Sequence, residues 1–88
     1  MITKACVIFH TVDGNIYEIP CHRHGDAYYI ISQFTNQNEI IKSQTEEGFW
    51  NENEEFLDRF DAYREAIRCH QFIPKDNKCK LLYSEDLY

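Results

Sequence analysis

One stretch, residues 47 to 67, constrains the fold more than any other part of the chain. Two short aromatic segments, Glu-Gly-Phe-Trp and Glu-Phe-Leu, flank the polar tetrapeptide Asn51–Glu54 and predict two strands joined by a turn. Asp58 follows where a helix N-cap belongs, because its carboxylate can accept hydrogen bonds from the free N–H groups of Phe60 and Asp61. The rest of the chain has to pack on the helix that begins here.

That helix has one apolar face. Tyr63, Ala66, Ile67 and His70 recur at the spacing of a single helical face, which predicts that this face is buried. Acidic side chains fall in the first turns and Arg68 falls in the last, as the helix dipole favours.

The N-terminal part of the chain predicts a β-hairpin. Thr3–His10 alternates with apolar side chains on both faces, which is typical of a strand covered on both sides. Asp13-Gly14 marks the turn. The return strand, Ile16–Ile19, is expected to end at Pro20, because proline cannot donate to the ladder.

A second helix is expected after the hairpin, capped at Gly25 or Asp26 and ending near residues 36–38. Its buried face is predicted from four apolar residues at i, i+3, i+4 and i+7, namely Ala27, Ile30, Ile31 and Phe34. The remaining expectations are a short strand or irregular crossover at 39–45, a loop at 71–78, a last strand at 80–83, and a terminal helical turn capped by Ser84.

Together these elements predict an α+β fold, in which a small antiparallel β-sheet carries two helices packed on one face, in a single domain of residues 1–88. Aromatic residues make up 15% of the chain, more than the core of so short a domain needs. We therefore expect a homo-oligomer that covers the surplus rings.

Charge and cysteine content narrow the classes of function. A net charge of −6 argues against binding of polymeric nucleic acid, which requires clustered Lys and Arg. No apolar run is long enough to cross a membrane. No secretory signal precedes the four cysteines, so we expect them to be reduced, in a cytoplasm.

The strongest candidate for a binding site is the segment His22, Arg23, His24 and Gly25 at the predicted start of the first helix. Free N–H groups and the helix dipole favour an anion there, the Arg23 guanidinium suits a phosphate, and Gly25 allows close approach to the backbone. The alternative is that Arg23 is a surface residue paired with a nearby glutamate and that the two histidines simply flank a turn.

Catalysis and metal binding are not indicated. The Cys and His residues lack the paired spacing of structural zinc sites, and buried thiols acting as small apolar groups explain the cysteines better. No nucleophile motif is present. We therefore predict no metal, no cofactor and no enzyme activity.

The surplus aromatic rings offer a second kind of binding surface. Some can stack on a nucleobase with a guanidinium such as Arg59 or Arg64 beside them. The alternative is packing in the core or in an oligomer interface.

Three pieces of the chain, taken together, resemble small proteins from bacteriophage genomes. They are Arg23–Asp26, the pair of motifs Glu47–Phe49 and Phe56–Arg59, and the terminal Leu82–Tyr88. The ordering is similar to that of Thoeris anti-defence proteins, which sequester cyclic ADP-ribose isomers. The histidine-rich Cys-His-Arg-His segment departs from a plainly basic one.

The resemblance implies an oligomer that grips its ligand between protomers. In that arrangement Arg23 holds phosphates, while Arg59, Asp86 and a ring such as Phe49 or Tyr83 frame a base and its ribose. The first functional hypothesis is therefore a phage anti-defence protein in the host bacterial cytoplasm. It binds and sequesters cyclic nucleotide immune signals (cyclic ADP-ribose isomers, CBASS cyclic oligonucleotides, or both) without cleaving them.

The second hypothesis is an acidic protein-binding inhibitor of a host defence enzyme, similar in kind to an anti-CRISPR protein. Glutamates of residues 46–55 can mimic the phosphates of a nucleic acid toward a basic partner.

Overall fold

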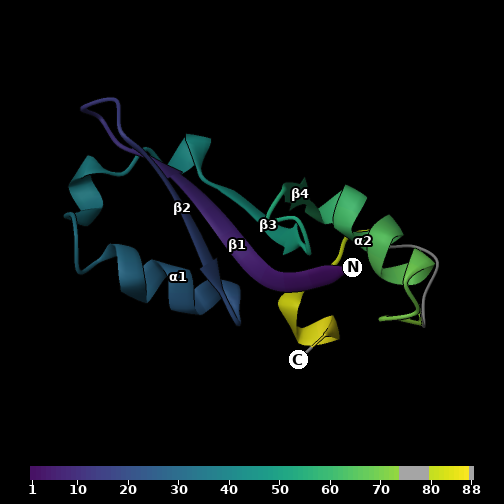
Figure 1. Cartoon of the computed structure of the whole chain (residues 1–88). Coiled ribbons are helices and arrows are strands. Elements are labelled where there is room, and N and C mark those ends of the chain that lie inside the picture. Colours follow the sequence, from purple (N-terminus) through teal and green to yellow (C-terminus); the bar gives the residue numbers. More distant parts are fainter. Residues whose placement is uncertain (74–79, 88) are drawn as a thin grey trace.

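The computed structural model describes residues 1–73 and 80–87 and shows a four-stranded antiparallel sheet with two α-helices (Figure 1). The strand order is β2-β1-β3-β4, so the long first strand lies inside the sheet. In chain order the elements are β1 Ile2–His10, β2 Ile16–Cys21, α1 His24–Ile31, η1 Gln37–Glu39, η2 Lys42–Gln44, β3 Glu46–Asn51, β4 Phe56–Asp58, α2 Arg59–Arg68 and η3 Ser84–Asp86. The α+β class predicted from the sequence is confirmed.

The β1–β2 hairpin forms as its alternation predicts. Ala5, Val7 and Phe9 are fully buried on one face of β1, and Cys6 is fully buried on the other. Gly14 closes the turn at φ +88°, a left-handed conformation that glycine adopts without a steric penalty.

β2 runs through the proline that was expected to end it and reaches Cys21. The predicted end at Ile19 was wrong because β2 is an edge strand. Pro20 pairs in register with Cys6, and a missing N–H that faces the open edge removes no ladder hydrogen bond. A proline on the edge also hinders the addition of a further strand.

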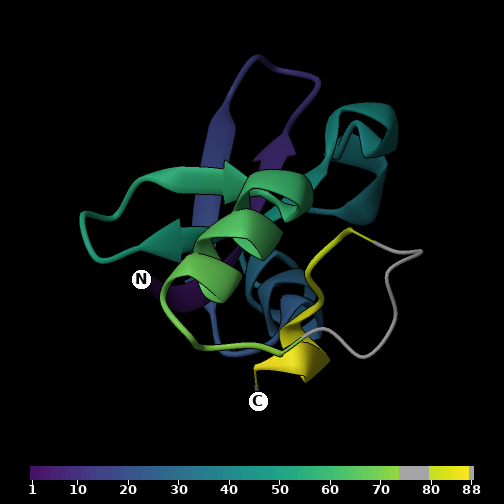
Figure 2. The ribbon, with the colours of Figure 1, turned by 90° about the vertical axis from the view of Figure 1, so that its right-hand side faces the viewer.

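β3 and β4 pair as the aromatic segments predict, and β4 leads directly into α2 (Figure 2). The side-chain oxygen of Asn51 closes the turn by accepting hydrogen bonds from the N–H groups of Asn53 (2.9 Å) and Glu55 (3.0 Å). Asp58 is the N-cap of α2 and accepts from the N–H of Asp61 at 2.7 Å, which confirms the predicted cap.

Each helix buries only part of its predicted face: Ala27 and Ile31 of α1 are buried with Ile30 packed beside them, and Tyr63 and Ala66 of α2 are buried. α1 has its N-cap at Arg23 and ends at Ile31, so Phe34 lies past the helix and is 69% exposed. α2 buries Ala62, Tyr63 and Ala66.

The two remaining residues of the predicted α2 face are not part of it. Ile67 is 36% exposed, and His70 lies beyond the helix end at φ +58°. The predicted face was therefore misplaced, because Ala62 rather than Ile67 completes the buried stripe.

Residues 39–45 form an irregular crossover, one of the two alternatives expected there, and not a strand. The 3₁₀ turns η1 and η2 lie on either side of an isolated bridge between Ile40 and Thr11. Residues 80–83 do not form the expected strand. The last turn, η3, has Tyr83 rather than Ser84 at its N-cap. The loop predicted at 71–78 lies partly outside the described residues.

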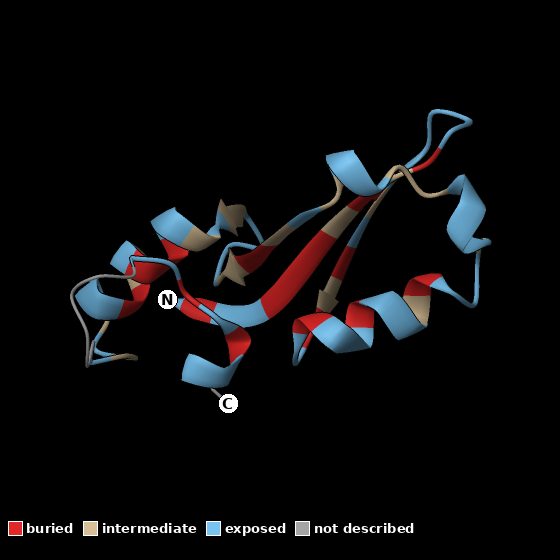
Figure 3. Ribbon diagram, turned by 180° about the vertical axis from the view of Figure 1, so that it is seen from behind, coloured by how far each residue is buried: buried red, intermediate tan, exposed pale blue. Residues whose placement is uncertain are grey.

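One core cluster lies between the sheet and the helices (Figure 3). It joins β1 and Phe49 of β3 to residues of both helices and to Leu82 near the C-terminus. This places α1 and α2 on the same face of the sheet, as predicted. Among the described residues, no helix is both apolar enough and long enough to span a membrane.

Candidate functional site

The start of α1 is closed by one of the chain's own carboxylates. The N–H of Arg23 donates to Asp26 Oδ2 at 3.3 Å, and the N–H of Asp26 donates back to the carbonyl of Arg23 at 2.9 Å. His22 and Arg23 are exposed, and a Cβ added at Gly25 would meet no atom within 4 Å. An anion at this helix start therefore has open space, but it has to share that space with the Asp26 carboxylate.

His24, the first residue of α1, points into the protein. Its imidazole Nε2 lies 2.7 Å from the carbonyl oxygen of Gly48, and its ring meets the Phe49 ring edge-on at 5.0 Å. Both side chains are buried. The structure thus brings these two predicted site residues together, as packing partners in the core.

Burial lowers the pKa of His24 below its ordinary value of 6.5, and the nearby Arg59 charge acts in the same direction. The bond to the Gly48 carbonyl and the charges of Glu47 and Glu85 oppose this shift without reversing it. His24 is therefore neutral at pH 7, and because a carbonyl only accepts, the proton sits on Nε2.

This burial predicts a loss of stability in mild acid. Below about pH 6.5 the unfolded chain protonates His24 while the native state resists, so the free energy of unfolding falls as the pH drops from 6.5 toward the native pKa. Urea unfolding at about pH 7.5 and about pH 5.5 measures the difference. The variant His24→Gln, whose amide can still donate to Gly48, should lose this part of the pH dependence; an unchanged slope would assign it to other groups.

Arg59 lies at the centre of a network that links three segments. Its Nη2 donates to Glu47 Oε1 at 2.5 Å, and its Nη1 donates to the carbonyl of Leu82 at 2.7 Å. The guanidinium carbon lies 4.6 Å from the centroid of the Tyr83 ring. The other oxygen of Glu47 accepts from the Tyr28 hydroxyl at 2.5 Å.

Burial pushes the pKa of Glu47 up, but the hydrogen bonds from Tyr28 and Arg59 outweigh it and hold the pKa below its ordinary value. Burial and the Glu47 carboxylate raise the pKa of Tyr28. The site residues Arg59 and Tyr83, distant in sequence, thus lie together, but Arg59 already has a carboxylate partner. Asp86 accepts from the N–H of Tyr83 at 2.9 Å and so caps η3.

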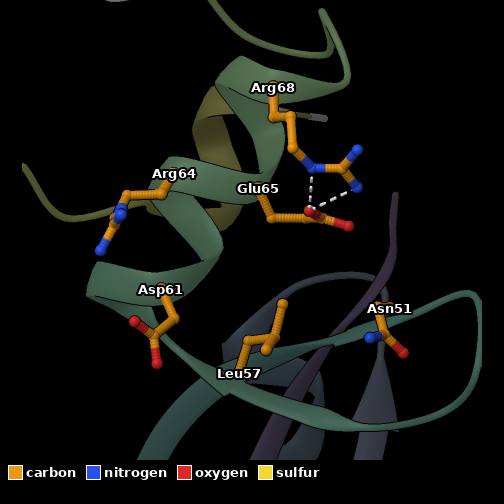
Figure 4. A pocket seen from close by; sticks show the side chains of 6 residues that line it. All are labelled: Asn51, Leu57, Asp61, Arg64, Glu65 and Arg68. Atoms are coloured by element: carbon orange, nitrogen blue, oxygen red, sulfur yellow. Dashed lines mark hydrogen bonds and ion pairs between the residues drawn. The ribbon is translucent and has the colours of Figure 1, made fainter.

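Two of the cavities that described residues line lie along α2. The first has a volume of about 450 Å³ and carries mixed charge (Figure 4). Arg68 is paired with Glu65 there, with 2.8 Å between Nη2 and Oε1. Arg64 points away from that pair (Figure 4). The lining residues are Asn51, Leu57, Asp61, Arg64, Glu65 and Arg68.

The second cavity has a volume of about 340 Å³ and is lined by Phe60, Tyr63, Arg64 and Lys80. Phe60 is 46% exposed, so its ring is accessible. Neither Arg64 nor Lys80 forms an ion pair with a residue that the structure describes. We call these four residues the α2 cavity.

Two residues of the α2 cavity belong to the second kind of binding surface that the sequence predicts: Arg64 is a guanidinium expected beside a stacking ring, and Phe60 is one of the surplus rings. Their local signal is that an aromatic ring and a guanidinium at i and i+4 share one face of a helix. Lys80 carries none, since only the fold brings it beside α2.

A third cavity, of about 310 Å³, is mainly apolar and lies between α1, β1 and the η1–η2 segment. Its residues are Phe9, Tyr28, Ile31, Ser32, Gln37, Ile40, Lys42 and Thr45. Within residues 1–73 and 80–87, no group of three or more His, Cys, Asp or Glu side chains is placed to hold a metal ion.

The fold and these cavities define a small α+β protein with a cationic, ring-lined hollow on its second helix. The chain matches, over residues 1–88, the family described as Phage T4 y16D protein, and it belongs to that family. The expected bacteriophage grouping is thereby confirmed, while the family description names no activity or ligand. No curated protein and no solved structure matches the chain.

Proposed function

We propose that this phage protein binds a phosphorylated, nucleotide-like small molecule and holds it without cleaving it. The observation that carries the proposal is the α2 cavity. In a chain of net charge −6, Arg64 and Lys80 meet there beside two aromatic rings, and no described carboxylate pairs with either.

The chemistry of the α2 cavity matches the two halves of a nucleotide. The Arg64 guanidinium is a planar fork that binds two phosphate oxygens at once, and the Lys80 ammonium adds a point charge. The exposed ring of Phe60 offers a face on which a base can stack, an interaction of about 1–3 kcal/mol per base. Holding the ligand intact depends on slow release and requires no catalytic group.

The resemblance to Thoeris anti-defence proteins supplies the ligand class. Cyclic ADP-ribose isomers and cyclic oligonucleotides both combine bases with phosphates. A volume of about 340 Å³ lies near the lower end of small-molecule pockets, about 300–1,000 Å³. It suits one nucleotide unit of a larger cyclic ligand. Sequestration of such a signal would deprive a host immune effector of its trigger.

The phosphate site predicted at the start of α1 provides fewer available contacts to a phosphate than the α2 cavity does. At the start of α1, the Asp26 carboxylate accepts from the N–H of Arg23. At Arg59, the first residue of α2, a ligand phosphate would have to displace the Glu47 carboxylate, whereas no described carboxylate forms an ion pair with Arg64.

Titration calorimetry with cyclic ADP-ribose, 3′,3′-cyclic GMP-AMP and AMP tests the proposal. We expect at least one cyclic probe to bind, and to be recovered intact after the protein is filtered and heat-denatured. Loss of one charge-assisted contact costs about 1.5–3 kcal/mol, so Arg64→Ala and Lys80→Ala should each weaken binding about 10- to 100-fold.

Arg68→Ala is the matched control, because Arg68 lies on the same helix but is paired with Glu65. Its affinity should equal that of the parent protein. Arg23→Ala tests the seat at α1 in the same assay. Absence of binding by every probe, or recovery of a converted product, would contradict the proposed function.

A further inference from the structure

The side of the sheet that faces away from both helices is uncovered by any described element. The pairing register shows which residues lie side by side on this face, in rows that cross β1. Lys4 pairs with Trp50, Cys6 lies between Pro20 and Gly48, and Ile8 lies between Glu18 and Glu46. We call this surface the open sheet face. Its apolar side chains, including Ile8, Trp50 and Phe56, are not part of the core cluster.

Trp50 forms the centre of the open sheet face. Its indole N–H donates to Glu18 Oε1 at 2.5 Å, and these two residues belong to strands on opposite sides of β1. The side chain therefore crosses β1, and Cys6 beneath it is fully buried. The ring itself stays only partly buried, as do Ile8 and Phe56. Large, partly exposed aromatic side chains of this kind are typical anchors of a protein interface.

The charges of the open sheet face are separated along β1. Lys4 lies in the row of Trp50, and Glu46 lies in the row of Ile8. At about 3.3 Å per residue, these rows are roughly 13 Å apart, too far for an ion pair within one copy. Both residues are exposed, and neither forms an ion pair with another described residue.

We propose that two copies of this chain pack through their open sheet faces, around a two-fold axis that crosses β1 at Cys6. Cys6 lies midway between Lys4 and Ile8, so this axis brings the lysine row of each copy over the Ile8–Glu46 row of the other. A two-fold interface requires such self-complementarity, since each contact occurs twice. The proposal does not depend on the proposed ligand.

The size of the surface predicts a modest affinity. Strands about 4.8 Å apart and about 3.3 Å per residue give a footprint of roughly 20 by 20 Å on each copy, which is below the area of about 800 Å² per partner of a standard specific interface. We therefore expect a dissociation constant in the micromolar range that rises with salt. The alternative occupant of the open sheet face is a different protein with a strongly basic surface. Binding of such a partner would not require the chain to self-associate.

Light scattering coupled to size exclusion, together with sedimentation equilibrium, tests the interface from about 5 to about 500 µM protein. We expect a shift from monomer to dimer across this range. Lys4→Glu and Glu46→Lys should each weaken dimerisation at least about tenfold, because each places like charges opposite one another. The combination Lys4→Glu with Glu46→Lys should restore the dimer.

Lys42→Glu is the matched control, since Lys42 lines the apolar cavity on the other side of the sheet, and its dimerisation should stay at the parent level. Arg64→Ala should change ligand binding and leave the mass unchanged, which separates this proposal from the proposed function. A monomer at every concentration, or a double variant no better than the single ones, would overturn the interface. Circular dichroism of each variant checks that the fold is kept.

Discussion

Replacing Gly48 with alanine is expected to lower the free energy of unfolding by about 2–4 kcal/mol. A Cβ at this position would lie 2.3 Å from the carbonyl oxygen of Leu57 and 2.5 Å from the ring of Phe56. The ring can rotate away, but the carbonyl belongs to the backbone of β4. β4 pairs directly with Gly48 through Asp58, so relief requires β4 to move.

The damage should spread beyond the one contact. β4 carries Asp58, the N-cap of α2, and Arg59 follows it. The carbonyl of Gly48 also bonds to His24 at the start of α1. A displaced β3–β4 pair therefore disturbs both helix starts. A domain of this size has only about 4–13 kcal/mol of total stability, so this loss is a large share of it.

Urea unfolding followed by tryptophan fluorescence measures the effect, with Gly25→Ala as the matched control. Gly25 lies in α1, and a Cβ there would meet nothing within 4 Å. Alanine at a helical position should stabilise the protein by about 0.5–1 kcal/mol. Equal stabilities of Gly48→Ala and the parent protein would mean that β4 does not approach Gly48 as closely as described.

Local chemistry was enough to predict the parts of the fold that depend on near neighbours. Asp13-Gly14 set the hairpin turn, and Asp58 set the start of α2, because each acts on backbone groups within a few residues. The errors came from tertiary context. Pro20 is tolerated because β2 is an edge strand. Ile67 is displaced from the buried face because Ala62 meets the sheet instead.

The candidate site was harder to predict for the same reason. Composition showed a surplus of rings but could not say that Phe49 faces the core while Phe60 faces solvent. It also could not show that Glu47, in an acidic stretch, neutralises Arg59. The presence of Lys80 and Arg64 in the same cavity depends on how distant segments pack together, which no local pattern encodes.

Arg59→Ala is expected to lower the free energy of unfolding by roughly 2–4 kcal/mol. The change removes the ion pair to Glu47, the hydrogen bond to the carbonyl of Leu82 and the contact with the Tyr83 ring. The Arg59 and Glu47 side chains are only 18% and 33% exposed, so Glu47 would keep a half-buried charge with the Tyr28 hydroxyl as its remaining described donor. This partial exposure keeps the expected loss below that of a fully buried pair.

Two measurements separate a role in docking the C-terminal segment from a general loss of packing. The N–H of Leu82 donates to the carbonyl of Arg59, a bond that survives in the variant only if residues 80–87 stay docked. Hydrogen exchange at Leu82 should therefore accelerate more than exchange in β1. Arg59→Lys keeps the positive charge but loses the planar guanidinium, so its stability should lie between those of the parent protein and Arg59→Ala.

A double-mutant cycle with Glu47→Gln measures the interaction energy between Arg59 and Glu47. Because Arg59 and Glu47 contact each other directly, their interaction energy should reach about 1–3 kcal/mol, and the double variant should be more stable than the sum of the single losses implies. Strict additivity would mean that Arg59 acts mainly through Leu82 and Tyr83. Glu47 could then release the Arg59 guanidinium to a phosphate at little cost, and Arg59 would become a second candidate for phosphate binding beside Arg64.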